Sequence, residues 1–392
     1  MRVTLLEDRI SNFRGTKTLN NTSITTIILS GGYSSRMGSF KPFLKFGEKS
    51  VIEIIIDAYK SAGINNIIVV TGYKGTEVAA KLRESGVMCL QNENHAEGMF
   101  TSVIKGVKAL DTSVSAFFIH PADIPHVKKY TIEGLINKYL ESGKGIIYPD
   151  FCGQMGHPPL IDCKYREAIL RSNGEGGLQK ILNGYACDSV YLPVFDKAVL
   201  MDMDTKEDYK KLLDYFNAAA PDMEECCSIL DIHKVPENII RHCRRVSEVS
   251  SEIFHSLSNA GYELNEGALK AAAMLHDLAK KEENHAQVGE KILREIGYEK
   301  VGSIIGSHTD IEVDDQGGIT ESEILYLADK LVREDQVISI EERFKQSLNK
   351  YQDNLEVLRK IKNRRDAADK IIKKIEAATG KGFGYGWKDI PG

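Results

Sequence analysis

Short runs of β-branched and other apolar residues alternate with helical patterns through the N-terminal half of the chain. Strands are predicted at residues 26–29, 67–71, 87–90 and 116–119, with helices between them at 51–62, 76–84 and 102–110. Strand–helix alternation of this kind predicts a Rossmann-like α/β domain over residues 23–216, with a mostly parallel sheet and helices on both faces. Such folds bind ligands at the carboxyl ends of their strands.

The hydrophobic pattern changes near Asn217. Residues 217–235 show no clear period and are predicted to form a linker. From Pro236 onward amphipathic helices follow one another with almost no strand signal, and Ile239, Val246 and Val249 share one face of the first. An all-α domain is therefore predicted over residues 236–379, with a poorly ordered extension at 1–22 and an irregular, glycine-rich tail at 380–392.

Composition narrows the class of protein. A chain of 392 residues is long enough for two domains, and its hydrophobic fraction of 42% is normal for globular proteins. The net charge of −5 gives no reason to expect nucleic acid or an anionic membrane as partner. The 7 cysteines form no Cys-x-x-Cys pair, and no apolar run approaches the roughly 20 residues of a membrane helix. We expect a soluble, cytoplasmic protein with reduced thiols and no signal peptide.

The first predicted strand runs directly into a glycine-rich loop at residues 30–38, followed three residues later by Lys41. Glycines let the backbone approach a polyphosphate and direct several N–H groups at it. Arg36 and Lys41 would neutralise charge on the phosphates during transfer. Alone, such a loop could be a plain strand-to-helix turn or a dinucleotide-binding loop. The absence of Gly-x-Gly-x-x-Gly and of the Walker lysine pattern argues against the second.

Carboxylates follow two other apolar runs. Asp123 comes directly after the strand at 116–119, and Asp202 and Asp204 follow a later run. Carboxylates at strand ends can hold Mg²⁺ over bound phosphates. The alternatives are a solvated turn for Asp123 and a helix N-cap for Asp204 or Thr205. The combination with the glycine-rich loop favours a magnesium site.

Four motifs in this order resemble the MobA-like nucleotidyltransferases, over residues 24–216. The loop and Lys41 resemble the family signature, whereas residues 97–102 (Glu-Gly-Met-Phe-Thr-Ser), 156–158 (Gly-His-Pro) and 202–205 (Asp-Met-Asp-Thr) are similar to the molybdopterin cytidylyltransferase branch. Residues 174–178 sit where that branch carries a glycine-bearing substrate loop. The resemblance implies transfer of a nucleotide from an NTP to a terminal phosphate of molybdopterin, with release of pyrophosphate.

The resemblance also implies roles for individual residues. The catalytic residues would be Arg36, Lys41 and Asp123, and Mg²⁺ would be held by Asp123 with Asp202 or Asp204. The NTP would be bound by Leu29, Ser30, Gly31, Gly32, Ser34, Ser35, Arg36, Met37, Gly38, Lys41, Gly98 and Ser102. The acceptor would be bound by Gly156, His157, Pro158, Gly176 and Gly177, although His157 could equally be a packed structural residue.

Two segments of the sequence indicate different bases for the NTP. Cytidylyl members usually carry Ala-Ala-Gly after the first strand and guanylyl members Ala-Gly-Gly, whereas this chain has Ser30-Gly31-Gly32. The segment Glu97-Gly98-Met99 is typical of the cytidylyl branch. We therefore expect CTP as the favoured donor and GTP as its rival. A molybdenum hydroxylase or its insertion chaperone is the partner expected to receive the product.

In the C-terminal half, residues of metal-binding type lie on apolar helix faces. His242 shares a face with Ile239 and Val246, His276 and Asp277 end the apolar run 271–275, and Asp329 lies on the face of Leu325 and Val332. Buried polar groups are costly unless they are paired, and a shared metal would satisfy all of them. The order resembles the HD superfamily over residues 236–345, which implies an all-helical, metal-dependent phosphohydrolase, although some members only bind ligands.

Two more histidines, His285 and His308, fall between Asp277 and Asp329. HD proteins with dinuclear centres carry two extra histidines there, so we expect one or two Fe, Mn or Zn ions at this site. The alternative is a mononuclear site with both histidines on the surface.

Two other functions stay open for the whole chain. The transferase could act on another phosphorylated acceptor, such as a phosphosugar or a phospho-alcohol, or one domain could be a nucleotide-sensing regulatory module. Lys41, Asp123 and a complete set of HD ligands favour catalysis over sensing.

Overall fold

The computed structural model describes residues 23–33, 36–380 and 382, and it divides into two compact units between Asn217 and Ala218. The extension predicted at 1–22, the loop residues Ser34 and Ser35, and nearly all of the tail predicted at 380–392 lie outside the described residues. The two units are considered separately.

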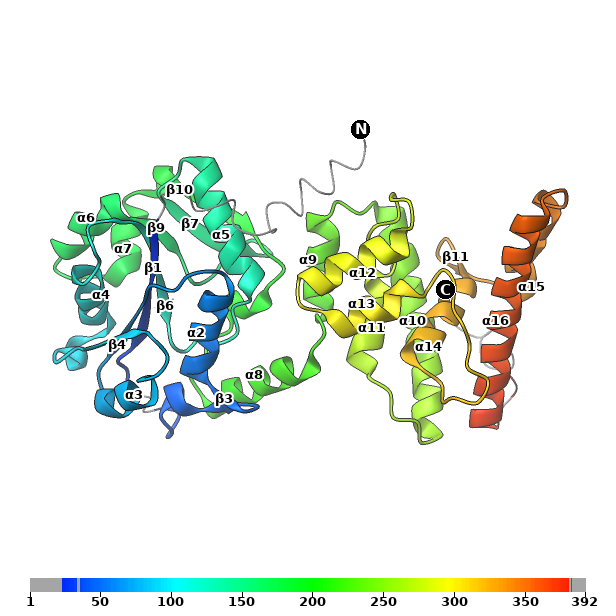
Figure 1. Ribbon diagram of the computed structural model, residues 1–392, viewed down its shortest axis with the longest axis horizontal. Helices are drawn as coiled ribbons and strands as arrows, with labels where there is room; N and C mark the ends of the chain where they lie inside the picture. Colours follow the sequence, from blue (N-terminus) through cyan, green and yellow to red (C-terminus); the bar gives the residue numbers. More distant parts are fainter. Residues whose placement is uncertain (1–22, 34–35, 381, 383–392) are drawn as a thin grey trace. The chain divides into compact units, whose positions relative to one another are not determined.

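The N-terminal unit contains an eight-stranded sheet in the order β10-β7-β9-β6-β1-β4-β5, with β8 paired to β7 (Figure 1). Its strands are β1 (Ser23–Ser30), β4 (Ile67–Thr71), β5 (Met88–Gln91), β6 (Val114–Pro121), β7 (Ile146–Phe151), β8 (Gln154–Met155), β9 (Leu160–Asp162) and β10 (Ser189–Pro193). All pairings are parallel except those of β8 and β9, which run antiparallel to their neighbours. The mostly parallel sheet predicted from the sequence is confirmed.

Helices cover both faces of this sheet. One face carries α2 (Val51–Ser61), α3 (Gly75–Lys81), α5 (Lys129–Ser142) and α8 (Lys206–Ala218), and the other carries α4 (Met99–Lys108), α6 (Arg166–Leu170) and α7 (Gly177–Asn183). A hydrophobic core lies on each face of the sheet, and successive residues of β1 point into different cores. Ile24 and Ile28 pack on the α2 face, and Ile27 and Leu29 pack on the α4 face. The result is a three-layer α/β domain.

A sequence feature determines where α2 begins. Ser50 and Glu53 form a capping box at its start, and its apolar residues recur at helical spacing and face the sheet.

The unit also contains short elements: β2 (Lys45–Phe46), β3 (Lys49–Ser50), η1 (Lys41–Phe43), η2 (His95–Glu97), η3 (Cys163–Tyr165), η4 (Ala186–Asp188) and η5 (Lys197–Leu200).

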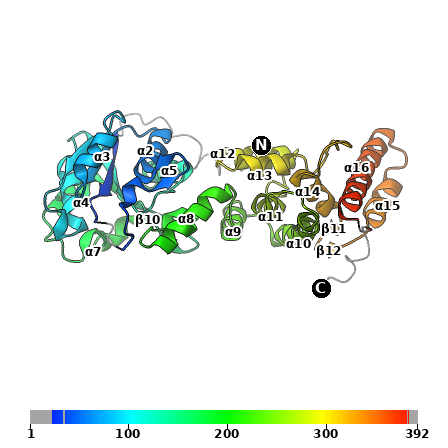
Figure 2. The same ribbon diagram turned by 90° about the horizontal axis from the view of Figure 1, so that it is seen from below.

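The C-terminal unit is helical, as predicted. It contains α9 (Met223–Ile232), α10 (Glu237–Asn259), α11 (Glu266–Leu275), α12 (His285–Glu295), α13 (Glu299–Gly306), α14 (Glu321–Lys330), α15 (Ile340–Lys350) and α16 (Leu355–Thr379), with a small hairpin of β11 (Val332–Arg333) and β12 (Gln336–Val337). Within this unit α12 packs against α13 and α15 against α16 (Figure 2).

The segment predicted as a linker, residues 217–235, is largely helical. Helix α9 begins with a capping box formed by Asp222 and Glu225, and it buries Ile229 and Leu230. It packs against α11, so these residues belong to the C-terminal unit. Helix α9 was not expected from the sequence, because three acidic residues and a pair of cysteines interrupt its short apolar stripe.

The last two helices are part of the same core. Helix α16 packs on α10, α14 and α15, and it buries Ala368 and Ile371 completely. The phenol of Tyr326 on α14 donates a hydrogen bond to the Arg364 carbonyl on α16, at 2.7 Å. Among the described residues, no helix has the length and apolar character needed to cross a membrane.

Candidate functional site

A cavity of about 320 Å³ lies at the carboxyl ends of β1 and β6. Eight residues expected to bind the NTP or the metal line it: Leu29, Ser30, Gly31, Gly32, Lys41, Gly98, Ser102 and Asp123. Motifs about 90 residues apart in sequence therefore meet at the sheet edge where folds of this class bind ligands.

Lys41 lies between two of the predicted carboxylates. Its Nζ is 2.7 Å from Asp204 Oδ1 and 3.6 Å from Asp123 Oδ2, and Arg36 reaches Asp204 from outside at 3.0 Å. Burial raises the pKa of Asp123, and the nearby carboxylates of Asp204 and Asp202 act in the same direction. The hydrogen bond from Lys41 lowers the pKa of Asp204. Asp123 and Asp204, which both lie within 3.6 Å of the Lys41 ammonium, and Asp202, which lies within electrostatic range of Asp123, suit a divalent cation bound by oxygen ligands.

Thr205 leaves Asp204 available to this cluster. The Thr205 hydroxyl accepts a hydrogen bond from the Asp208 backbone N–H at 3.2 Å, and the Asp208 carboxylate accepts one from the Thr205 N–H at 2.9 Å. This reciprocal pair caps α8, so of the two N-cap candidates it is Thr205 that has this role.

Three side chains beside the cavity, Tyr33, His95 and Asn92, were not expected from the sequence. Tyr33 and His95 line it with their rings 5.2 Å apart, and the His95 Nδ1 donates a hydrogen bond to the Asn92 carbonyl at 3.0 Å. Asn92 is buried and donates to the Ser102 hydroxyl at 2.9 Å, which orients that hydroxyl. An asparagine placed directly after the strand at 87–90 was the available signal.

Two of the residues expected to bind NTP have other structural roles. The Met37 side chain is buried in the core on the α2 face of the sheet, so it supports the loop from behind. Gly38 adopts a φ of 68°, a conformation that glycine takes without strain.

The residues expected to bind the acceptor lie outside the described lining of this cavity. Because β9 runs antiparallel to β6, its first residue Leu160 pairs with Phe118, and the preceding residues 156–159 lie toward the carboxyl end of β6. His157 is exposed and lies within electrostatic range of Asp123 and Asp202. This reversed strand brings the Gly156-His157-Pro158 motif toward the carboxylates.

The glycines of the second acceptor motif lie at the N-terminus of α7, with Gly176 as its N-cap and Gly177 as its first residue. Gly176 and Gly177 both have positive φ, of 76° and 66°. Gly156, in contrast, has no room for a side chain, because a Cβ there would lie 2.5 Å from Val199.

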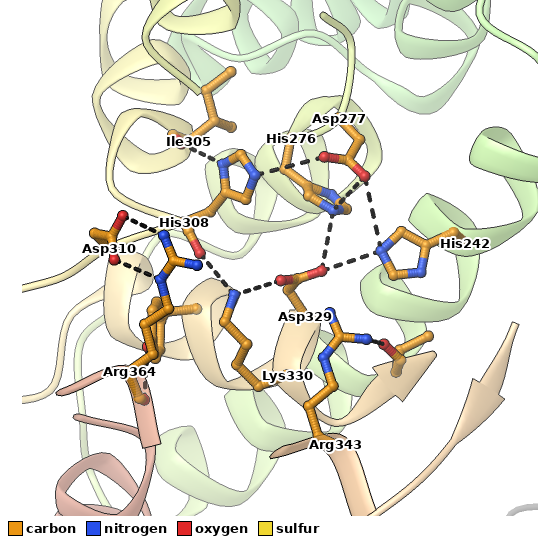
Figure 3. A network of polar contacts seen from close by, with 12 residues as sticks. His242, His276, Asp277, Ile305, His308, Asp310, Asp329, Lys330, Arg343 and Arg364 are labelled. Carbon is orange, nitrogen blue, oxygen red and sulfur yellow. Dashed lines mark hydrogen bonds and ion pairs between the residues drawn. The ribbon is translucent and has the colours of Figure 1, made fainter. Parts of the chain in front are cut away.

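In the C-terminal unit, the six predicted metal ligands form one cluster. They come from α10 (His242), the segment after α11 (His276 and Asp277), the start of α12 (His285), the segment after α13 (His308) and the end of α14 (Asp329). Figure 3 shows five of these side chains converging, with Asp277 facing the histidines and Asp329 between His242 and Lys330.

The two oxygens of Asp277 face two different groups of histidines. Its Oδ2 lies 4.0 Å from His242 Nε2 and 3.7 Å from His276 Nε2, and its Oδ1 lies 3.4 Å from His285 Nε2 and 3.5 Å from His308 Nε2. Each group is compact enough to hold one ion. Asp329 joins the first group, with Oδ1 at 3.1 Å from His242 Nε2 and 3.6 Å from His276 Nε2.

Backbone carbonyls fix the orientation of three of the imidazoles. The Nδ1 atoms of His242, His276 and His308 donate to the carbonyls of Glu334, Ala273 and Ile305, at 2.8, 2.8 and 2.7 Å. Because a carbonyl only accepts, each Nδ1 carries a proton, and Nε2 is therefore the ring nitrogen left to face a metal.

The buried atoms of this cluster fit a bound cation. The buried His276 Nε2 has no hydrogen-bond partner among the described residues, and the buried Asp277 Oδ2 has none there besides its ion pair with Lys280 at 2.9 Å. Although burial opposes the charge on Asp329, Lys330 at 2.6 Å and a hydrogen bond with His242 hold its pKa well below the usual range. Polar atoms in this state are costly without a partner, and a metal between them supplies one.

Comparison with known proteins identifies both units. The model of the MobA-like NTP transferase domain matches residues 26–190, and that of the HD domain matches residues 239–334. The molybdenum cofactor cytidylyltransferase of Escherichia coli is 31% identical over 192 residues, which are 48% of this chain and 94% of that protein.

Two further proteins resemble the N-terminal unit. An uncharacterised protein of Methanocaldococcus jannaschii is 32% identical over 165 residues, 41% of this chain and 88% of that protein. The crystal structure of Rv0371c from Mycobacterium tuberculosis is 23% identical and covers 49% of this chain and 99% of its own, with a TM-score of 0.43. The chain therefore belongs to the MobA-like NTP transferase family, with an HD domain following its transferase domain.

Proposed function

We propose that the N-terminal unit transfers CMP from CTP to a terminal phosphate of molybdopterin and releases pyrophosphate. The observation that carries this proposal is the convergence of Lys41, Asp123 and Asp204 on a cavity lined by the glycine-rich loop. The similarity to a molybdenum cofactor cytidylyltransferase supports the choice of donor and acceptor.

Alignment and charge neutralisation account for most of the proposed catalysis. The acceptor phosphate is already a nucleophile at neutral pH, so no strong general base is needed. Asp123 would hold Mg²⁺ with Asp202 or Asp204, and this ion would offset charge on the transferring phosphoryl group. Lys41 and Arg36 would stabilise the departing pyrophosphate, while the N–H groups of the loop hold the phosphates in line.

Pyrophosphate release, measured with each of the four NTPs and with or without molybdopterin, tests the assignment. We expect release that requires Mg²⁺ and molybdopterin and is fastest with CTP, with GTP second. Release that depends on a phosphosugar or phospho-alcohol in place of molybdopterin would establish the alternative acceptor.

We infer that the HD domain is a phosphohydrolase with two metal ions bridged by Asp277. The supporting observation is the division of its carboxylate, with one oxygen toward His242 and His276 and the other toward His285 and His308. These residues would hold the two ions, which would supply a water activated for attack on phosphorus. The ligand set of imidazoles and carboxylates suits Fe, Mn or Zn.

Metal analysis of protein purified without chelators tests this centre. We expect about two ions per chain, besides Mg²⁺, in the wild type and at most one in His308→Ala. His255→Ala is the matched control, because His255 is an exposed histidine on α10 outside the cluster. One ion in both wild type and His308→Ala, with unchanged phosphatase activity, would leave a mononuclear site.

The identity of the protein that receives the nucleotidylated cofactor stays a prediction. A nucleotidylated cofactor is large and reactive, so direct transfer to a molybdenum hydroxylase or its insertion chaperone would protect it from water. A pull-down from the native host that never recovers such proteins counts against this partner.

A further inference from the structure

Two cavities are lined by different members of the HD cluster. One, of about 370 Å³, is lined by His285 and His308, and the other, of about 430 Å³, by His242 and Asp277. The linings share Lys280, Asp329 and Arg343, so the cavities are two lobes that meet over the metal ligands. A substrate bound here has room on both sides of the point where the ligands converge.

Arg343 is brought to this meeting point by a helix outside the HD match, which ends at residue 334. The capping box formed by Ser339 and Glu342 starts α15 one helical turn before Arg343 and fixes the orientation of the first residues of the helix. The Arg343 Nη1 then donates to the Val332 carbonyl at 3.2 Å (Figure 3). The guanidinium is thus held at the junction of the lobes by one backbone contact.

The charges around the junction distinguish Arg343 from its neighbours. Lys280 pairs with Asp277 at 2.9 Å, Lys330 with Asp329 at 2.6 Å, and Arg364 with Asp310 through two short contacts. Among the cations that line the two lobes, Arg343 has no carboxylate within salt-bridge distance in the described part of the chain, and neither has Arg333. Arg333 instead donates to the carbonyls of Glu342 and Arg343 and lines one lobe only.

We propose that the HD site acts on a phosphodiester, with Arg343 binding a non-bridging oxygen of the reacting phosphate and the two ester groups lying in the two lobes. This inference rests on the phosphohydrolase activity proposed above. A diester has two ester groups, one for each lobe, and a non-bridging oxygen for the cation that the lobes share, whereas the terminal phosphate of a monoester has one ester group and needs only one lobe.

The reaction is an ordinary hydrolysis. The oxygen of a water molecule forms a bond to phosphorus, and the bond from phosphorus to one ester oxygen breaks. That oxygen leaves with the electron pair and takes up a proton, so the products are a phosphate monoester and an alcohol. Arg343 stays bound to the phosphoryl oxygen throughout and changes no bond.

Two chromogenic probes separate the possibilities. We expect the p-nitrophenyl ester of thymidine 5′-monophosphate, a diester, to be hydrolysed with a kcat/KM at least tenfold above that of p-nitrophenyl phosphate, a monoester. Faster hydrolysis of the monoester would overturn this inference and leave the phosphohydrolase standing. Hydrolysis of neither probe would contradict both.

Substitution of Arg343 tests its role in binding. Arg343→Met should raise the KM for the diester about tenfold or more, the loss typical of one charge-assisted hydrogen bond, with Arg343→Lys intermediate. The affinity of Arg343→Met for thymidine 5′-monophosphate, measured by calorimetry, should fall by a similar factor. The metal content of this variant should stay at the wild-type value. Lys345→Met, which changes an exposed lysine on the same helix, is the control. Unchanged KM and affinity in Arg343→Met would refute the assignment.

Discussion

The bridging role proposed for Asp277 predicts that its substitution has a different effect from substitution of Asp329, the other carboxylate of the cluster. An asparagine keeps the shape of the side chain but loses its charge, and its NH₂ group cannot bind a cation. Asp277 faces both histidine groups, whereas Asp329 lies close to His242 and His276 only. Asp277→Asn should therefore lose both ions, and Asp329→Asn should keep the ion between His285 and His308.

The size of the effect follows from the number of ions that remain. A ligand present at 100 times its dissociation constant stabilises the folded state by about 2.7 kcal/mol, so two ions contribute roughly 5 kcal/mol. For a unit of about 150–250 residues, each kcal/mol moves the midpoint of thermal unfolding by about 2–4 °C. We expect metal to raise the midpoint of the C-terminal unit by roughly 10–20 °C in the wild type, by about half of that in Asp329→Asn, and by almost nothing in Asp277→Asn.

Thermal unfolding followed by calorimetry, with and without metal, measures this directly. Comparing each variant with its own metal-free form removes effects unrelated to binding, such as the buried Lys330 that Asp329→Asn leaves without its carboxylate. Metal content should follow the same order of two, one and none. Equal shifts in the two variants would show that Asp277 does not bridge two ions, and the dinuclear centre would have to be abandoned.

Three further predictions concern the transferase unit. Asp123→Ala should abolish Mg²⁺-dependent pyrophosphate release, and Lys41→Ala should lower kcat far more than it weakens NTP binding; an Asp123→Ala enzyme with wild-type turnover would refute the metal assignment. Gly31→Ala should raise the ratio of CTP to GTP turnover, because a Cβ there lies 3.0 Å from the Ser102 hydroxyl and narrows the cavity; an unchanged ratio would show that Gly31 does not influence the base. Burial lowers the pKa of His120 and His126 to about 4. Their contribution to the free energy of unfolding is therefore fully present above pH ~6.5 and is lost as the pH falls toward 4. The loss is about 1.4 kcal/mol per pH unit for each histidine. Urea unfolding at several pH values should give about half of this slope in His120→Gln, and an undiminished slope would contradict the prediction.

The sequence predicts the central strands and the helices between them because each strand is a compact β-branched run and each helix repeats its apolar residues at regular spacing. It does not predict β9, which has three residues, or its antiparallel direction. That direction depends on pairing with β6 and β7, which are distant in sequence. The capping box of Asp222 and Glu225 was a readable sign of α9, but the apolar stripe behind it is too short to stand out.

Four of the metal ligands proposed for the HD domain, His242, His276, Asp277 and Asp329, could be found from the sequence because they lie on apolar helix faces or end an apolar run. A buried histidine or aspartate in such a position needs a polar partner, and a shared metal would supply one. His285 and His308 were expected from the resemblance to HD proteins with dinuclear centres. Arg343 could not be found in this way, because a charged residue on an amphipathic helix is ordinarily solvated. Its position follows from the packing of α15 and α16, which no local pattern in the sequence records.

The three backbone hydrogen bonds to His242, His276 and His308 also bear on which metal the protein carries in a cell. Ligands that are held in place before an ion arrives do not rearrange to favour one ion over another of similar size. Selection then falls to intrinsic affinity, which follows the same order for most nitrogen and oxygen sites, and to the supply of each ion. The metal found in the HD domain should therefore vary with the growth medium, and protein from manganese-rich and zinc-rich cultures should differ in content but not in fold.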